Sequence, residues 1–374
     1  MNISPDFSRL ENTAYRRSRL QQLSIALVGL GALGSEVIRL LGMLEIGRIL
    51  LIDPDTVETS NYLHSPAVRK ISSIDRSKAD VFARYGNENF SHTQWISFPV
   101  EIADVGFGDL EVCDLLFSCT DNALARAETA WVSQRLGISV VDGGTRGSAW
   151  WKGRVSWFPG TLESACYLCQ LSHARRAELL SQSLATSLSC TGSNPDSTQA
   201  FPATPMMASV IAAMQVDLGL RSWLAGDEDG ARAWEISLDD RTPSLESLAV
   251  PRSSECPWHG PELRDRLHEL PEQQPLHASL HLHKNGAKNG AYDEILADWP
   301  ICLCARCLRC GHEWQPMQRV ARIRRYGYCP ECRQANPLPV KVIASVRAED
   351  EWARHTPGEL GFPSNHRYTF RRTK

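Results

Sequence analysis

The sequence lacks any apolar run close to the roughly 20 residues that a membrane-spanning helix needs. Its opening stretch, MNISPDFSRLENTAYRRSRL, lacks the apolar core of a secretory signal peptide. It also lacks an internal repeat at a fixed period, so nothing points to a repeat architecture. We therefore expect a cytoplasmic globular protein with no membrane partner. Its 374 residues leave room for roughly two domains of about 150 residues each.

The net charge is only −3, but it is unevenly distributed along the chain. From Ile301 to Lys374 there are 14 Lys and Arg against 6 Asp and Glu, a balance of +8, which leaves −11 for the first 300 residues. A basic appended segment suggests an acidic partner surface or nucleic acid. A solvated tail without a charge-specific partner explains the pattern equally well, so nucleic acid is allowed but not favoured.

The hexapeptide GLGALG follows the apolar run Ser24–Val28 and precedes a segment with helical spacing. This is the strand, turn and helix start of a nucleotide-binding βαβ unit. Gly29 would allow the tight turn, Gly31 the close approach of a phosphate, and Gly34 close packing of helix on strand. Strands and helices alternate to about Trp157, which predicts a doubly wound, Rossmann-like α/β fold with a mostly parallel sheet.

Three further elements are expected outside that core. A basic first helix is predicted from Ser8 to Leu23 and a long helix from about Pro205 to Leu224, followed by β-like segments around Trp234 to Leu238.

Polar side chains follow two of the predicted strands. Asp53 ends the run Arg48–Ile52 and is placed to bond ribose hydroxyls, whereas Asp121 and Asn122 follow the buried run Leu115–Phe117. A carboxylate opposite a phosphate-binding turn suits Mg²⁺ on a nucleoside triphosphate. The alternative is that Asp121 only caps the following helix.

Basic side chains could neutralise the phosphates of that nucleotide. Lys78 and either Arg16 or Arg17 are the candidates. Together with Asp121, Lys78 argues for ATP and against a dehydrogenase that uses the same glycine motif for NAD.

Five ordered pieces resemble the ubiquitin-activating enzyme superfamily in its small bacterial MoeB/ThiF-like form: GLGALG, LIDPDTVETSN, Lys78, SCTDN and the pair Cys166 and Cys169. They cover roughly residues 8 to 260. The resemblance implies a homodimer that uses ATP and Mg²⁺ to adenylate the carboxyl end of a small ubiquitin-fold protein, usually ending in Gly-Gly. The implied domains are 1–265 for adenylation, 266–298 as a linker, and 299–374 as a zinc-ribbon module with a basic tail.

The resemblance also implies roles for single residues. An arginine, Arg16 or Arg17, would reach the triphosphate across the dimer interface, and His64 stands where the family commonly has a second arginine. That departure keeps open a catalytically inactive scaffold subunit. The remaining nucleotide-site residues by resemblance are Gly29, Gly31, Gly34, Asp53, Asp55, Asn61, Lys78, Asn122 and, for magnesium, Asp121.

The 12 cysteines sit mostly in CxxC pairs, which in a chain without a signal peptide indicate zinc rather than disulfides. Two of the CxxC motifs are separated by the spacing of a zinc ribbon. Cys302 and Cys304 lie just upstream of them and could compete as ligands. By the resemblance, a second site would be Cys₃His and structural, although buried thiols without metal are the alternative. The two expected ligand sets are Cys307, Cys310, Cys329 and Cys332, and Cys166, Cys169, Cys256 and His259.

Cys190 stands outside any CxxC, in the Ser-rich loop LSQSLATSLSCTGSNPDST. A flexible loop suits a nucleophile that attacks a bound acyl adenylate to form a thioester, as in some members of the family, although an incidental thiol is the alternative. The expected next step is transfer to a conjugating enzyme, which would fit a role in bacterial antiviral defence. Adenylation for sulfur transfer or tRNA modification is the alternative.

Overall fold

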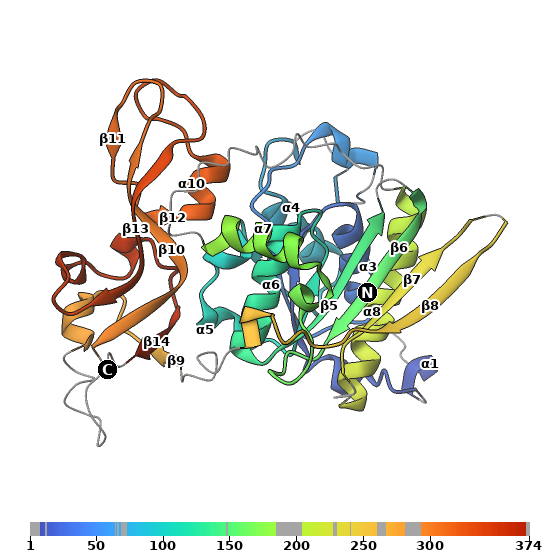
Figure 1. The fold of residues 1–374 in the computed structure, drawn as a ribbon. Helices are drawn as coiled ribbons and strands as arrows, with labels where there is room; N and C mark the ends of the chain where they lie inside the picture. Colours follow the sequence, from blue (N-terminus) through green and yellow to red (C-terminus); the bar gives the residue numbers. More distant parts are fainter. Residues whose placement is uncertain are drawn as a thin grey trace, which may run out of the picture. The chain divides into compact units, whose positions relative to one another are not determined.

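The computed structural model describes residues 8–11, 13–63, 65, 67–68, 73–146, 149–184, 204–226, 230–239, 241–259, 267–280 and 293–371. The chain divides into two compact units (Figure 1). The first comprises residues 1–102, 110–171 and 197–259, and the second comprises 103–109, 172–196 and 260–374.

The first unit is built on an eight-stranded sheet in the order β3-β2-β1-β4-β5-β6-β7-β8. The first five strands of that order are parallel and the last three are antiparallel additions. This confirms the predicted mostly parallel, Rossmann-type α/β sheet. The strands are β1 (Ser24–Val28), β2 (Arg48–Ile52), β3 (Gln94–Phe98), β4 (Leu115–Ser118), β5 (Ser139–Arg146), β6 (Ala149–Phe158), β7 (Arg232–Ser237) and β8 (Ser244–Ala249).

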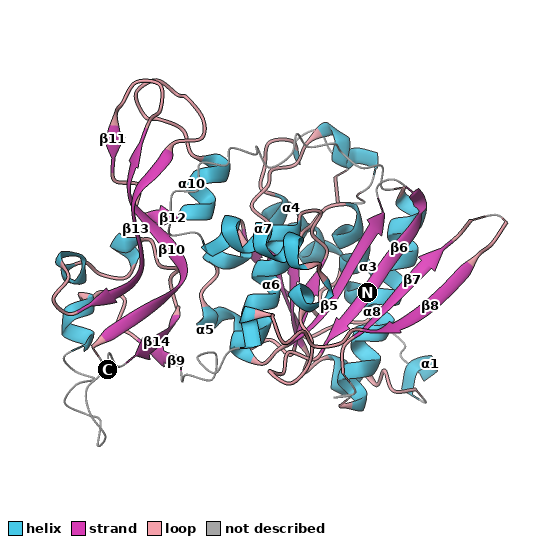
Figure 2. Cartoon of the chain, viewed as in Figure 1, coloured by secondary structure: helices cyan, strands magenta, loops and turns pink. Residues whose placement is uncertain are grey.

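Helices pack on this sheet because its central strands are apolar on both faces (Figure 2). Helix α8 packs on α3, β5 and β6, α4 packs on β2 and β3, and α6 packs on β4 and β5. The helices of the unit are α1 (Ser8–Glu11), α2 (Arg17–Leu20), α3 (Ala32–Met43), α4 (Lys78–Asn89), α6 (Ala123–Leu136) and α8 (Pro205–Ala225), with 3₁₀ turns η1 (Thr59–Leu63), η4 (Tyr167–Gln170) and η5 (Pro257–His259).

Local sequence signals set the ends of the long helices. The Thr204 hydroxyl accepts a hydrogen bond from the Met207 amide ahead of Pro205, and α8 ends at Gly226 in the left-handed conformation. The predicted helix from Pro205 and the β-like segment around Trp234 are both confirmed.

The predicted basic helix from Ser8 to Leu23 is wrong, because two four-residue helices, α1 and α2, lie in that stretch. The Thr13 hydroxyl donates to the Leu10 carbonyl and accepts from the Tyr15 amide. Such side-chain bonds to nearby backbone compete with the helical ladder, and here they fall between the two helices.

The second unit holds a six-stranded antiparallel sheet around one long strand, β10. Leu270, Leu276 and Leu280 join its apolar core, so part of the stretch predicted as a linker is structured. Its elements are α5 (Phe107–Leu110, whose last residue belongs to the first unit), α7 (His173–Leu184), β9 (Leu267–Glu269), β10 (Glu294–Arg306), β11 (Glu313–Trp314), β12 (Gln318–Arg319), α10 (Val320–Tyr326), β13 (Leu338–Arg347), η7 (Glu351–Arg354), η8 (Gly358–Leu360) and β14 (Arg367–Arg371), with the turn η3 (Ile102–Asp104) at the unit boundary.

A buried ion pair anchors one side of this second sheet. The Arg319 guanidinium, 3% exposed, donates to both carboxylate oxygens of Asp104 at 2.6 and 3.1 Å. Arg322 adds a third bond to Asp104 at 2.9 Å. Burial alone would raise the pKa of Asp104, but these two arginines outweigh it and lower that pKa, so the carboxylate stays charged. Among the described residues, no helix is long and apolar enough to cross a membrane.

Substitution of Gly34 tests the tight turn after β1. A Cβ on Gly34 would collide with the carbonyl oxygen of Gly29, whereas a Cβ on Gly31 would meet nothing within 4 Å. We expect Gly34→Ala to lower the free energy of unfolding by about 1–3 kcal/mol, measured by urea denaturation of the full chain. Gly31→Ala is the matched control and should cost clearly less. Equal losses in the two variants would contradict this packing.

Candidate nucleotide site and zinc centres

The two loops predicted to hold a nucleotide follow neighbouring central strands, at the carboxyl ends of these strands. Strands β1 and β4 are parallel neighbours, with Val28 paired to Ser118 at their carboxyl ends. Gly29 has φ +89°, and a Cβ there would come within 2.9 Å of Cys119 and Thr120, so the turn requires glycine. Because the chain order reverses between β1 and β4, this is the crevice where open α/β sheets bind ligands.

Asp53 joins two loops of that crevice through its carboxylate. Its carboxylate, 4% exposed, accepts hydrogen bonds from the backbone amides of Leu30 at 2.6 Å and Asp55 at 2.8 Å. Burial raises the pKa of Asp53, against these two bonds and the charge of Lys78. The sequence predicts that Asp53 binds the ribose of the nucleotide. The structure shows that its side chain also holds the glycine loop and the turn after β2.

Lys78 forms an ion pair with one carboxylate and is stabilised by the charges of two others. Its ammonium lies 3.0 Å from the Asp55 carboxylate, and its side chain is only 12% exposed. Burial works against the charged amine, but the nearby carboxylates of Asp53, Asp55 and Asp121 outweigh it and raise the pKa of Lys78. Lys78 therefore forms an ion pair with Asp55, and the charges of Asp53 and Asp121 add to the stabilisation of its ammonium.

The cap role considered for Asp121 belongs to its neighbour. The Asn122 side chain accepts from the Ala125 amide at 2.7 Å and caps α6, while Asp121 is exposed. The Asn61 side chain accepts from the Glu58 amide at 2.9 Å in the turn η1. Asp121 therefore does not cap α6, and each of the two asparagines holds its own local turn.

The two amino-terminal arginines differ in their surroundings. Arg17 pairs with Glu45 at 2.8 Å, and Arg16 is exposed at the amino end of α2. His64 and Cys190 lie outside the described residues.

Sequence reasoning missed a buried network beneath the Asp121 loop. Arg126 donates to the Thr120 carbonyl at 2.8 Å, to the Gly143 carbonyl at 3.0 Å and to the Asp142 carboxylate at 3.0 Å. Asp142 is 2% exposed and also accepts from the Ser118 hydroxyl at 2.7 Å. A charged residue inside the apolar run SVVDGG was the available signal, because a buried carboxylate requires a partner.

A cavity of about 290 Å³ opens beside this network. Arg126, Lys152 and Arg154 contribute basic groups to its lining, and Glu235 and Glu246 contribute acidic ones. Gly144 and Arg154 are paired across β5 and β6, so the antiparallel part of the sheet forms a wall of the cavity. The cavity and the Asp121 loop share Arg126.

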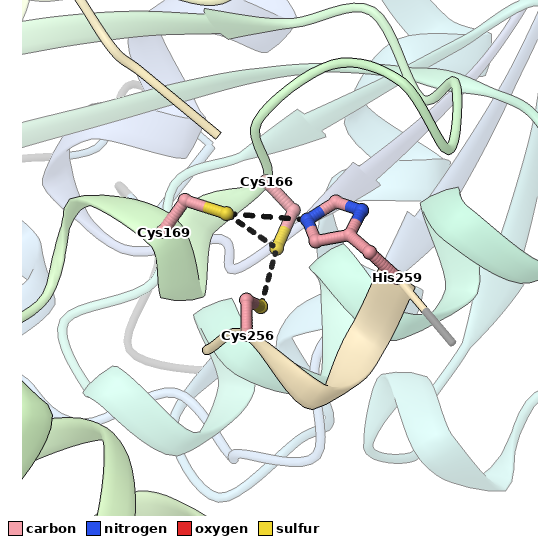
Figure 3. A group of neighbouring side chains, drawn as sticks. All are labelled: Cys166, Cys169, Cys256 and His259. Carbon is pink, nitrogen blue, oxygen red and sulfur yellow. Dashed lines mark hydrogen bonds between the residues drawn. The ribbon is translucent and has the colours of Figure 1, made fainter. Parts of the chain in front are cut away.

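Three thiols and one imidazole meet at the predicted Cys₃His site (Figure 3). The Sγ atoms of Cys166 and Cys169 are 4.0 Å apart, those of Cys166 and Cys256 are 3.7 Å apart, and Cys169 Sγ lies 3.2 Å from His259 Nε2. Tetrahedral zinc with Zn–S bonds of about 2.3 Å separates sulfurs by about 3.8 Å, so the group fits this ion. Hydrogen bonds from the neighbouring thiols and His259 lower the pKa of Cys169, which favours the thiolate that zinc binds.

The second predicted ligand set also comes together, in the second unit. Cys307 Sγ lies 3.5 Å from Cys332 Sγ, and Cys310 Sγ lies 3.6 Å from Cys329 Sγ. All four ligand atoms lie within 4.8 Å of one another, and neither Cys302 nor Cys304 belongs to this group.

The two turns that carry the second ligand set have the same backbone pattern. The amides of Cys307 and Cys329 donate to the carbonyls five residues on, and the carbonyls of the same two cysteines accept from the amides four residues on. Each turn therefore supplies two thiols, and the four thiols together suit one tetrahedral ion.

The ThiF family model matches residues 7–258, about two thirds of the chain. The chain belongs to the ThiF family. Its sequence is similar to a Candida albicans protein named adenylyltransferase and sulfurtransferase UBA4, with 30% identity over 168 residues, which is 45% of this chain and 36% of that protein. A Saccharomyces cerevisiae protein named ubiquitin-activating enzyme E1-like is 26% identical over 132 residues, 34% of this chain and 20% of that protein. The chain thus spans about a third or less of the length of these relatives.

Among solved structures, a crystal structure of E. coli MccB with succinimide is similar to this ThiF family chain. The TM-score is 0.50 at 18% identity, covering 69% of this chain and 75% of that one. At this identity the likeness supports the fold only.

The metal content of the purified chain tests both cysteine clusters. We expect two zinc ions per chain by elemental analysis, one for each ligand group. Cys256→Ser should leave one ion, because three ligands hold zinc far more weakly than four. Cys302→Ser is the matched control: its buried thiol hydrogen-bonds the Cys304 carbonyl, and its loss should leave two ions. Absence of zinc from the wild-type chain would overturn the assignment.

Proposed function

We propose that this chain is an adenylyltransferase that uses ATP and Mg²⁺ to activate the carboxyl end of a small ubiquitin-fold protein. The observation that carries the proposal is the geometry at the sheet's switch point: the Asp53 carboxylate binds the glycine-loop amide of Leu30, Lys78 pairs with Asp55, and Asp121 follows the neighbouring strand β4. Membership of the ThiF family and the names of the similar proteins support the same chemistry.

Each residue in the crevice has a proposed task. The open backbone at Gly31 and the start of α3 would receive phosphate, Asp53 would bond the ribose, and Lys78 would neutralise phosphate charge. Asp121 would hold Mg²⁺, which supplies positive charge against the leaving pyrophosphate. Asp55, Asn61 and Asn122 would complete the nucleotide site by shaping its loops.

The cavity beside Arg126 would take the substrate's carboxyl end. A carboxylate oxygen attacks the α-phosphorus of ATP, and the bond to pyrophosphate breaks to leave an acyl adenylate. The lining carries three basic groups, Arg126, Lys152 and Arg154, against the two carboxylates of Glu235 and Glu246, and this net positive charge suits a carboxylate.

The proposed assembly is a homodimer, with an arginine from one protomer at the nucleotide of the other. Arg16 suits this task better than Arg17, because Arg17 already pairs with the buried Glu45 while Arg16 is exposed. Replacement of the family's arginine by His64 would then be offset within the site by Lys78.

Loss of Asp121 tests the adenylation step. We expect Asp121→Ala to abolish ATP–pyrophosphate exchange while the fold persists, since Asp121 is exposed and accounts for none of the caps described above. A group acting mainly on the transition state should cost several powers of ten in rate, at roughly 1.4 kcal/mol each.

Glu88→Ala is a charge-matched control for that experiment. Glu88 is exposed near the far end of α4, the helix that begins at Lys78. It should exchange at the wild-type rate. Wild-type exchange in Asp121→Ala would remove Asp121 from the mechanism.

The second proposed step is transfer of the acyl group to Cys190. Among the cysteines that the structure describes, those outside the two metal groups are Cys113 and Cys119, both buried, and the pair Cys302 and Cys304 in the second unit. Burial also raises the pKa of Cys119, which disfavours its thiolate. The described cysteines therefore offer no better acceptor than Cys190.

Replacement of Cys190 separates the two steps. Cys190→Ala should retain pyrophosphate exchange, which needs no thiol, and lose any thiol-sensitive covalent adduct with the partner protein. Cys113→Ala should keep both. Persistence of the adduct in Cys190→Ala would show that another group accepts the acyl chain.

The proposal also includes the steps that follow acyl transfer to Cys190. Thioester formation would precede transfer to a conjugating enzyme, in a setting such as antiviral defence. Sulfur transfer is the second candidate, favoured by the names of the UBA4 relatives.

A further inference from the structure

We propose that the tip of the second unit, which we define as residues 307–312 and 325–334, binds single-stranded nucleic acid. The tip comprises the two cysteine turns and the end of α10, held together by the four thiols of the second ligand group. None of these residues belongs to the crevice or the cavity described in the first unit, and the proposal does not depend on adenylation.

Aromatic rings are exposed on this tip. Tyr328 is 60% exposed and Tyr326 is 42% exposed. The backbone of Tyr328 is fixed by a bridge to Ala335 and by the adjacent ligand Cys329, so its ring is presented from a rigid base. Exposed flat rings on a rigid base are what unpaired bases stack on.

Positive charge accompanies the rings. Arg309, Arg325 and Arg333 are exposed, and the tip contains one acidic residue, Glu331. The Arg325 guanidinium lies 5.0 Å from the centre of the Tyr326 ring. Arg309 lies between the first two ligands and Arg333 directly follows the last, so the metal group brings these two charges to the same end of the unit.

The combination favours a single strand over the alternatives. An acidic protein surface would also use the arginines and the exposed Leu308, but it does not require flat rings beside cations. A duplex would use the arginines but keeps its bases stacked inside, away from side chains. A single strand uses both features, through phosphate contacts and base stacking.

The test is fluorescence anisotropy of a labelled 20-nucleotide mixed-sequence single strand with the full, zinc-loaded chain. We expect saturable binding that is tighter than binding to the duplex of the same sequence. Tyr328→Ala should weaken it about tenfold, whereas Tyr328→Phe, which keeps the stacking face, should bind as the wild type does. Arg309→Ala and Arg333→Ala should each lower the slope of log affinity against log salt by about 0.7.

Arg354→Ala is the matched control for the arginine variants. Arg354 is exposed on η7. Strand β13 pairs its first residue, Leu338, with Arg306 beside the tip and its last, Arg347, with Glu294 at the other end of β10, so η7 follows the far end. Affinity and salt slope should not change. Zinc content and the melting temperature certify that each variant is folded.

Three outcomes would overturn the proposal: no saturable binding, duplex binding as tight as single-strand binding, or equal affinities of the wild type and Tyr328→Ala. If a polyglutamate peptide binds instead and Arg309→Ala weakens that binding, the surface is a protein-docking site.

Discussion

The buried carboxylate of Asp53 is the constraint on which the nucleotide crevice depends. One side chain fixes the amide of Leu30 in the glycine loop and the amide of Asp55 in the next turn, and Lys78 balances its charge. Loops after two different strands are therefore tied to a single anion. Removing this carboxylate would leave the buried Leu30 amide and the part-buried Asp55 amide without their partner, a larger penalty than the loss of one ordinary hydrogen bond. The residue that we propose to bind ribose thus also fixes the two loops of its own site.

A second buried carboxylate, that of Asp142, supports the loop that carries Asp121 in a similar way. Through Arg126 it is linked to the Thr120 carbonyl, the residue before Asp121, and to the Gly143 carbonyl on β5. Polar groups of this kind lie in a low-dielectric interior, where satisfied networks are rigid and broken ones are costly. The exposed Asp121 is accordingly carried on a loop whose backbone is held from beneath. Such support matters because catalytic groups must be placed to within fractions of an ångström.

The parts of this arrangement that sequence could predict are those with local signals. The apolar runs at β1, β2 and β4, the glycine spacing and the CxxC pairs depend on residues a few positions apart, and the sheet type and the thiol group of the second unit followed from them, whereas the pairing of Cys166 and Cys169 with the distant Cys256 and His259 came from the family resemblance. Contacts between distant segments have no such signal. The Arg126 network joins α6 to β4 and β5, and β9 pairs with β14 about a hundred residues later. The Thr13 bonds that separate α1 from α2 were missed for a different reason, since propensity alone favoured one helix.

The Cys₃His group connects these local and distant constraints. Its ligands follow β6 and β8, so they bracket the antiparallel strands whose side chains line the cavity. Between two of them, Trp258 is 1% exposed, and its ring centre lies 5.5 Å from that of Trp131 on α6. Arg126 lies on the same helix, one turn and a half before Trp131. A metal that closes this group would therefore hold the cavity wall and the helix carrying Arg126 in register, while the glycine loop and Asp53, anchored by their own hydrogen bonds, would not depend on it.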